Sequence, residues 1–115
     1  MSQADVLARC IDACFRCAQS CTSCADACLN EETVADLRRC ISLCLTCADV
    51  CATTGAALSR SLISGEASVR GLVQACVEMC AACAEECERH AHHHEHCRVC
   101  AEVCRECEKS CRELL

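Results

Sequence analysis

Cysteine, a small residue that suits a protein core, recurs along this chain at alternating spacings of four and three residues. A 4-3 step follows one face of an α-helix, where apolar side chains normally form the core. The pattern therefore predicts four helices whose buried faces carry thiols. The four runs contain all nineteen cysteines: Cys10, Cys14, Cys17, Cys21, Cys24 and Cys28; Cys40, Cys44, Cys47 and Cys51; Cys76, Cys80, Cys83 and Cys87; Cys97, Cys100, Cys104, Cys107 and Cys111.

The expected helices span about residues 3–28, 34–61, 68–90 and 94–114. Ser2 is a candidate N-cap for the first helix, and Thr33 with Asp36 forms a weakened capping-box pattern before the second. Because the joining segments are short, sequential helices should pack antiparallel. The expected fold class is all-α: an up-down-up-down four-helix bundle with a cysteine-lined core, in a single domain over residues 1–115.

Antiparallel packing makes the two ends of this bundle chemically different. One end, which we call the aliphatic end, has no cysteine. The other, which we call the histidine end, has ligands for soft and borderline metals. The aliphatic end collects Val6, Leu7, Leu58, Leu62, Val69, Leu72, Val73 and Leu114. The histidine end collects Cys28, Leu37, Cys87, His90, His94 and Cys97. We expect hydrocarbon to close the first end and metal to enter at the second.

Charge and hydropathy limit the partners and the compartment. The net charge of −6 favours neither nucleic acid nor an anionic membrane, so we expect no partner of either kind. No uninterrupted apolar run approaches the roughly eighteen residues of a membrane span. The first residues carry charge and lack the apolar segment of a signal peptide, so the sequence predicts a cytoplasmic protein.

Disulfides are a poor explanation for so many cysteines. A reducing cytoplasm disfavours them, and nineteen thiols cannot pair completely within one chain. Cβ atoms three or four residues apart on a helix are also roughly 5–6 Å apart, farther than a disulfide allows. Packing alone does not explain four matching seams of thiols either, so we interpret the cysteines as metal ligands.

Thiolates select Cu(I), Zn(II) or Fe–S clusters. Four Zn(Cys)4 sites would use sixteen thiolates and leave a net charge of −8 in the core, whereas one Cu(I) per thiolate leaves none. Fe–S clusters usually take their cysteines from loops. Multiple Cu(I) ions, near one per cysteine, are therefore favoured. A zinc or Fe–S protein acting as a sensor or electron carrier, and a metal-free thiol redox buffer, remain as alternatives.

The histidine stretch between the third and fourth helices offers further ligands. His90 follows Cys87 by three residues and so continues the thiol seam, which makes it a candidate metal ligand. His93, His94 and His96 are candidates for a metal entry site, whereas His92 is interpreted as part of a solvated turn. Met79 is expected to pack at the flank of the core. No nucleophile–base pair or phosphate loop is evident, so we expect no enzymatic activity.

A second, mostly apolar stripe follows one residue after the thiols of the first two helices. Flanking of the core and an oligomer interface explain it equally well. The stripe contains Ile11, Phe15, Ala18 and Ala25 in the first helix, and Ile41, Leu45, Ala48 and Ala52 in the second.

The Cys-x3-Cys-x2-Cys-x3-Cys unit present in all four expected helices resembles the bacterial copper storage proteins, a family of copper-binding four-helix bundles. The resemblance covers essentially the whole chain. It implies that the core cysteines hold many Cu(I) ions and that histidines lie near one open end where metal enters. The cytosolic branch of the family implies a homotetramer. The implied function is storage and detoxification of Cu(I), delivered by a low-molecular-weight thiol or a chaperone.

Overall fold

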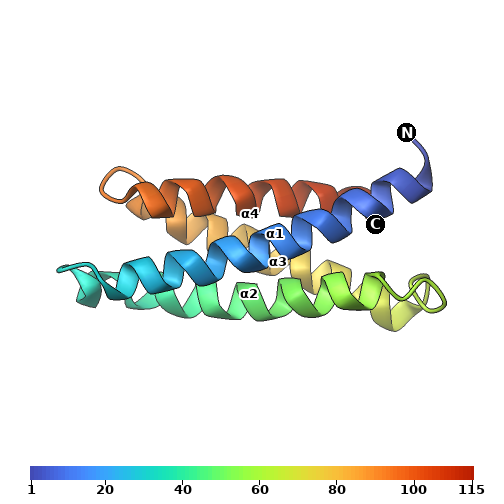
Figure 1. Ribbon diagram of the computed structural model, residues 1–115, viewed down its shortest axis with the longest axis horizontal. Helices are drawn as coiled ribbons and strands as arrows, with labels where there is room; N and C mark the ends of the chain where they lie inside the picture. The colour runs from blue at the N-terminus through green and yellow to red at the C-terminus, as the bar shows by residue number, and fades with distance from the viewer.

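Four long helices form the protein, and the computed structural model describes all 115 residues (Figure 1). The helices are α1 (Gln3–Leu29), α2 (Arg38–Leu58), α3 (Ala67–His90) and α4 (Glu95–Leu114), with a 3-10 helix, η1 (Val34–Leu37), before α2. The expected all-α fold class is confirmed, and three of the four expected helices have ends within one residue of the observed ones.

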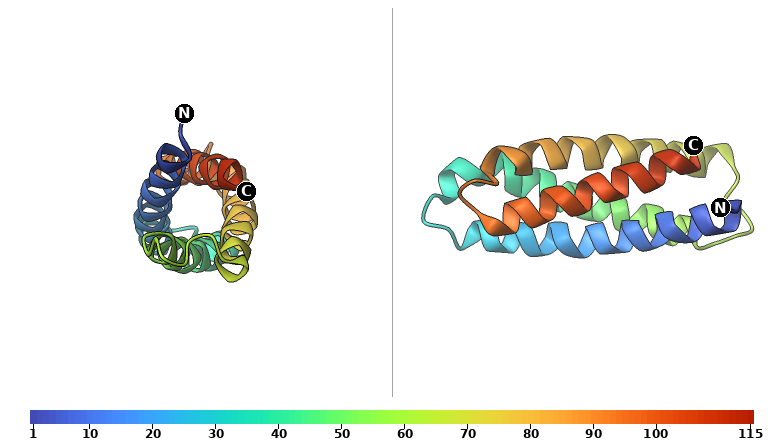
Figure 2. Two further views of the ribbon diagram at one scale, coloured as in Figure 1. Left: turned by 90° about the vertical axis from the view of Figure 1, so that its right-hand side faces the viewer. Right: turned by 90° about the horizontal axis from the view of Figure 1, so that it is seen from above.

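The helices pack as an antiparallel ring. Each packs its backbone against those of its two neighbours (α1–α2, α2–α3, α3–α4 and α4–α1). The diagonal helices α1 and α3 meet only through side chains, such as the sulfurs of Cys21 and Cys83. The end-on view in Figure 2 shows this ring, and the long view shows the α1–α2 and α3–α4 connections together at one end. Both termini and the α2–α3 connection lie at the opposite end (Figure 1). With extents of 47 × 23 × 17 Å, the bundle is long and narrow, so one seam from each helix faces a shared axis.

Helix α1 begins where the sequence predicts. The hydroxyl of Ser2 accepts a hydrogen bond from the backbone N–H of Asp5 at 3.1 Å. The backbone N–H of Ser2 donates to a carboxylate oxygen of Asp5 at 3.3 Å. This reciprocal pair is a capping box, and it satisfies N–H groups that have no partner within the helix.

The expected helix over residues 34–61 was wrong at both ends. Its first four residues form η1, and Thr33 makes no side-chain capping bond, so the weak capping box is absent. At the other end α2 stops at Leu58, and the Ser59 hydroxyl donates to the carbonyl of Gly55 at 2.7 Å. That bond satisfies a carbonyl in the last helical turn, as terminal carbonyls require.

The aliphatic end differs from the expectation at one residue. Leu58, Val69 and Val73 are buried as expected. Leu62, however, is 95% exposed. The cause is the early end of α2, because residues 59–66 form the connection to α3 and carry the Leu62 side chain into solvent. At the histidine end the large buried aliphatic residue is Leu37 of η1, at 1% exposure.

Two helical segments are long and apolar enough to cross a membrane by length and composition, Val34–Leu58 and Ala67–His90. Both segments contain charged residues, so the prediction that no uninterrupted apolar run approaches a membrane span still holds. Each segment carries four of the cysteines, whose thiols are apolar when protonated and face the inside of the bundle. Such a core helix passes the same test, so the observation is weak evidence for a membrane.

Candidate metal centre

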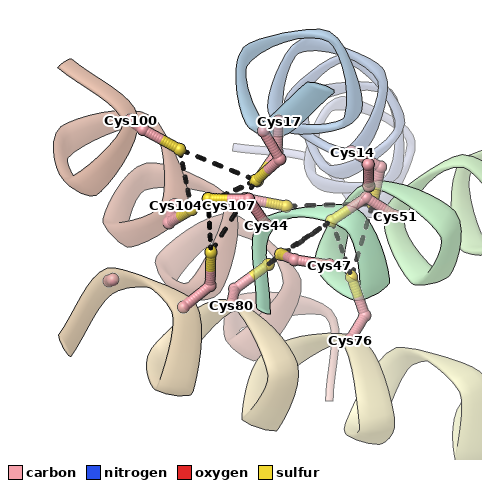
Figure 3. Packing of buried hydrophobic residues seen from close by; sticks show 14 of the residues in the cluster. Cys14, Cys17, Cys44, Cys47, Cys51, Cys76, Cys80, Cys100, Cys104 and Cys107 are labelled. Atoms are coloured by element: carbon pink, nitrogen blue, oxygen red, sulfur yellow. Dashed lines mark hydrogen bonds between the residues drawn. The ribbon is translucent and has the colours of Figure 1, made fainter. Parts of the chain in front are cut away.

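The cysteine side chains form the core of the bundle. Eighteen of the nineteen are 0% exposed, and Cys24 is 2% exposed. Figure 3 shows sulfurs from all four helices pointing toward one another across the bundle axis. Their alignment follows from the 4-3 spacing, which returns each successive thiol to the inner face of its helix. All nineteen candidate ligands predicted in the runs therefore lie in one continuous interior, and all nineteen thiols are free.

Most close sulfur neighbours lie on different helices. The Sγ atoms of Cys51 and Cys80 are 3.5 Å apart, and those of Cys21 and Cys104 are 3.6 Å apart. Within a helix, close pairs are four residues apart, such as Cys17 and Cys21 at 3.8 Å. The ring of helices therefore gives most of the sulfurs a close partner on another helix.

Sets of four sulfurs that all lie within 4.8 Å of one another recur along the axis. Two thiolates bound to one ion are separated by at most about 4.6 Å, given metal–sulfur bonds of about 2.3 Å, so these sets are of the right size to share ions. Cys17, Cys21, Cys104 and Cys107 each belong to two sets, so the sites overlap rather than standing apart. Among the sets are Cys14–Cys76–Cys107–Cys111, Cys17–Cys51–Cys80–Cys107, Cys17–Cys21–Cys47–Cys104, Cys21–Cys83–Cys100–Cys104 and Cys24–Cys40–Cys44–Cys87.

The interior contains almost nothing that could balance the charge of thiolates. Besides the cysteines, the buried polar or charged residues are only Thr54 and Glu86. No lysine or arginine is buried. Because uncompensated buried charge is costly, bound ions must neutralise the thiolates themselves. A monovalent ion at one per thiolate does this, whereas isolated divalent sites of four thiolates do not.

Thiol acidity differs along the core. Burial raises the pKa of Cys28 to about 11, which keeps that thiol protonated when no metal is bound. At the other end of α1, the hydrogen bond from Cys111 lowers the pKa of Cys10 to about 5. Their Sγ atoms are 2.8 Å apart. A thiol that stays protonated, such as that of Cys28, carries no charge in the metal-free core, and it releases a proton when it binds metal.

One histidine contacts the thiols. Nδ1 of His96 lies 3.5 Å from Sγ of Cys24, 3.6 Å from Sγ of Cys97 and 4.0 Å from Sγ of Cys28. Helix α1 supplies two of these sulfurs and the first turn of α4 supplies the third. Cys24 is also the one cysteine with any solvent exposure. Three thiols and an imidazole nitrogen therefore meet at the histidine end, where the core comes closest to solvent.

The other histidines are placed differently. Nε2 of His90 bonds to the carboxylate of Glu86 at 2.9 Å, and no thiol lies within hydrogen-bonding distance of the His90 ring. His94 lies beside His96, with ring centroids 5.3 Å apart, and its side chain is 14% exposed. His93 is exposed in the turn between α3 and α4, as is His92. Seam spacing therefore drew attention to His90, whereas the fold brings His96 to the sulfurs.

Two carboxylates at this end were missed from the sequence. Glu86 is 6% exposed and pairs with Arg39 at 3.4 Å and with Arg89 at 3.9 Å. Glu31 lies 2.9 Å from Nε2 of His96 and 3.1 Å from Nδ1 of His94. The hydrogen bond from His96 lowers the pKa of Glu31 below its usual range. No sequence spacing links residue 31 to residues 94 and 96, because only the meeting of two loops brings them together.

Comparisons with known proteins agree with this geometry. A family model described as "Copper storage protein" matches residues 3–115. A cytosolic copper storage protein from Streptomyces lividans, in a structure of its copper loading with five coppers, is 57% identical with a TM-score of 0.92, over 98% of this chain and 94% of that one. Another structure of that organism's copper storage protein, loaded with 10 copper equivalents, is 58% identical with a TM-score of 0.91, over 96% of this chain and 84% of that one.

A more distant structure, the Cu(I)-bound copper storage protein BsCsp3, is 34% identical with a TM-score of 0.80. The similarity covers 91% of this chain and 93% of that one. No curated protein matches the chain in sequence.

Proposed function

The chain belongs to the copper storage protein family, and we propose on that basis that it stores Cu(I) as many thiolate-bound ions in its cysteine core. The observation that supports this most directly is the set of nineteen buried thiols in overlapping groups with no buried cation to balance them. Storage near one Cu(I) per cysteine neutralises the core. Because Cu(I) binds two or three thiolates, ions can lie along the axis and share sulfurs between adjacent groups.

The ligands would be all nineteen core cysteines, together with imidazole nitrogen at the histidine end. Entry beside Cys24, Cys28 and Cys97 is favoured by the contact of His96 with all three sulfurs. From there Cu(I) would pass inward by exchange between neighbouring thiolates. The sulfur of Cys24 belongs to a set with Cys40, Cys44 and Cys87 whose members all lie within 4.8 Å of one another. Sulfurs farther along the core are 3.6–3.8 Å apart. The direct roles of His90, His93 and His94 as metal ligands stay predictions.

This storage would serve the cytoplasm, the compartment given for the Streptomyces lividans protein. There a low-molecular-weight thiol or a chaperone would hand over the ion, and uptake would also protect the cell from free copper. No catalytic role is proposed, because the core offers ligands rather than a nucleophile and base. Neither nucleic acid nor a membrane is proposed as a partner.

A homo-oligomer, a tetramer by family resemblance, is also proposed. Phe15 of α1 and Leu45 of α2 are 45% and 48% exposed, so part of the apolar stripe remains available to a second copy. Light scattering of the purified protein would give the mass of the assembly. If the protein were a monomer, the apolar stripe would only flank the core, and this part of the proposal would be wrong.

The test of storage is a titration of the fully reduced protein with Cu(I) against a chromogenic chelator. Saturation near one copper per cysteine is expected, with proton release in parallel. An end point of four or five ions, with cobalt occupying tetrahedral sites, would replace copper storage with structural zinc binding. Visible absorption by the purified protein that persists without added copper would instead indicate Fe–S clusters.

A further inference from the structure

Glu31 connects the two loops at the histidine end through a single carboxylate oxygen. It follows α1, and its backbone N–H donates to the carbonyl of Cys28 at 3.2 Å, which ties the loop to the last turn of that helix. Its Oε2 atom then lies 2.9 Å from Nε2 of His96 and 3.1 Å from Nδ1 of His94. The carboxylate thus faces opposite nitrogens of two neighbouring imidazole rings.

We propose that Glu31 is a positioning residue that sets the tautomers of both histidines for copper entry. An ionised carboxylate only accepts hydrogen bonds, so each facing ring nitrogen must carry the proton. His96 is then the Nε2–H tautomer and His94 the Nδ1–H tautomer. The proposal rests on the proposed function, because it concerns the place where Cu(I) would enter.

For His96, the consequence is that the ring nitrogen that faces the thiols keeps a free lone pair with which it can bind a metal ion. With Nε2 protonated, Nδ1 is unprotonated, and this is the atom 3.5 Å from the Cys24 sulfur and 3.6 Å from the Cys97 sulfur. A metal-binding imidazole is commonly fixed in this way by a carboxylate on its other nitrogen. Without Glu31 the proton could occupy Nδ1, and it would then point at the sulfurs and block the ion.

Glu31 gives His94 the opposite tautomer. With Nδ1 protonated, its Nε2 atom keeps the lone pair. The two rings are stacked with centroids 5.3 Å apart, and the side chain of His94 is 14% exposed. Two adjacent imidazoles would each offer one unprotonated nitrogen, one of them against the thiols. Glu31 therefore prepares two neighbouring ligands with one carboxylate.

Glu86 provides a matched comparison within the same end of the bundle. Its Oε2 atom also lies 2.9 Å from Nε2 of a histidine, His90, so the local hydrogen bond is the same. Two arginines, Arg39 and Arg89, share its other oxygen. The His90 ring has no sulfur within hydrogen-bonding distance, so fixing its tautomer prepares no contact with the core.

The first experiment reads the tautomers in the metal-free protein by long-range ¹H–¹⁵N correlation of ¹⁵N-labelled histidines near neutral pH. The expected wild-type signals are Nε2–H for His96 and Nδ1–H for His94. In Glu31→Gln and Glu31→Ala both rings should lose this fixed assignment, whereas in Glu86→Gln only His90 should change. A wild-type His96 ring with its proton on Nδ1 would overturn the proposal.

The second experiment measures stopped-flow transfer of Cu(I) from a chromogenic chelator. The rate for the first equivalents should fall about tenfold to a hundredfold in Glu31→Ala, the range for losing a carboxylate behind a ligating histidine. Glu31→Asp, which keeps the charge, should recover part of the rate, and Glu86→Gln should load like wild type. Total capacity should not change in any of them.

The outcomes separate a tautomer role from a loop-fastening role. Loss of stability without a change in tautomer or loading rate in the Glu31 variants would show that Glu31 only fastens the loops. If Glu31→Ala does not fold, the isosteric Glu31→Gln decides the result. If the wild type failed to store copper near one ion per cysteine, the proposed function would fail, yet the tautomer experiment would still test Glu31 because it needs no metal.

Discussion

Thiolates in the middle of the core should contribute more to copper capacity than the thiolates that lie nearest to the aliphatic end. Cys10 and Cys21 allow a matched comparison because both lie on α1 and both are 0% exposed. The only sulfur within hydrogen-bonding distance of Cys10 is that of Cys111, at 2.8 Å. By contrast, the sulfur of Cys21 lies 3.6–4.0 Å from those of Cys17, Cys83, Cys100 and Cys104.

The expected losses follow from this difference. Cys10→Ala removes a ligand with one close partner, so capacity should fall by about one copper ion if Cu(I) needs two thiolates. Cys21→Ala removes a thiolate that belongs to two of the overlapping four-sulfur sets, so capacity should fall by about two ions or more. Each substitution removes one buried sulfur and should cost a similar roughly 1–2 kcal/mol of folding stability.

Native mass spectrometry of the loaded variants counts the bound ions directly, and titration against a chromogenic chelator gives the same number in solution. Urea unfolding of the metal-free variants serves as the control for folding. If both variants lost the same number of ions, sulfurs would not be shared between adjacent sites, and the picture of a continuous thiolate core would have to be replaced by independent sites.

Three further predictions concern the scaffold. Gly55→Ala should lower the free energy of unfolding by about 1–2 kcal/mol in urea, because the added Cβ would lie 3.0 Å from Cζ of Phe15. In a Phe15→Ala background the same substitution should be neutral or stabilising. If it were still destabilising there, contact with the Phe15 ring would not be the cause. Ser2→Ala should lower the stability of the fold by about 0.5–2 kcal/mol in thermal unfolding, because the N-cap is lost, whereas Ser2→Asp should retain most of the wild-type stability. The hydrogen bond from Arg105 lowers the pKa of Glu88, so this pair should stabilise the fold above about pH 4.5 and lose its effect as the pH falls below that value. In Arg105→Ala the free energy of unfolding should therefore decrease less steeply as the pH is lowered. An unchanged pH dependence would show that the pair contributes nothing.

The helices and their thiol seams could be predicted from the sequence because both depend on local spacing. A 4-3 repeat returns to one helix face whatever surrounds it, so all nineteen cysteines could be assigned to the core before the fold was known. The N-cap at Ser2 is equally local, since it needs only a hydroxyl and a carboxylate three residues apart. The error at Leu62 arose where the chain leaves a helix, and spacing carries no information there.

The functional detail at the histidine end was decided only by the tertiary structure. Spacing along α3 singled out His90, yet the turn of α3 places it against Glu86, and the start of α4 presents His96 to sulfurs of α1. Likewise, Glu31 meets His94 and His96 only because two loops far apart in the chain converge at one end of the bundle. The sequence by itself determined which thiols line the core, because helical periodicity is local. The tertiary structure decided which sulfurs lie close together and which imidazole faces them, because those contacts depend on how four helices align across the axis.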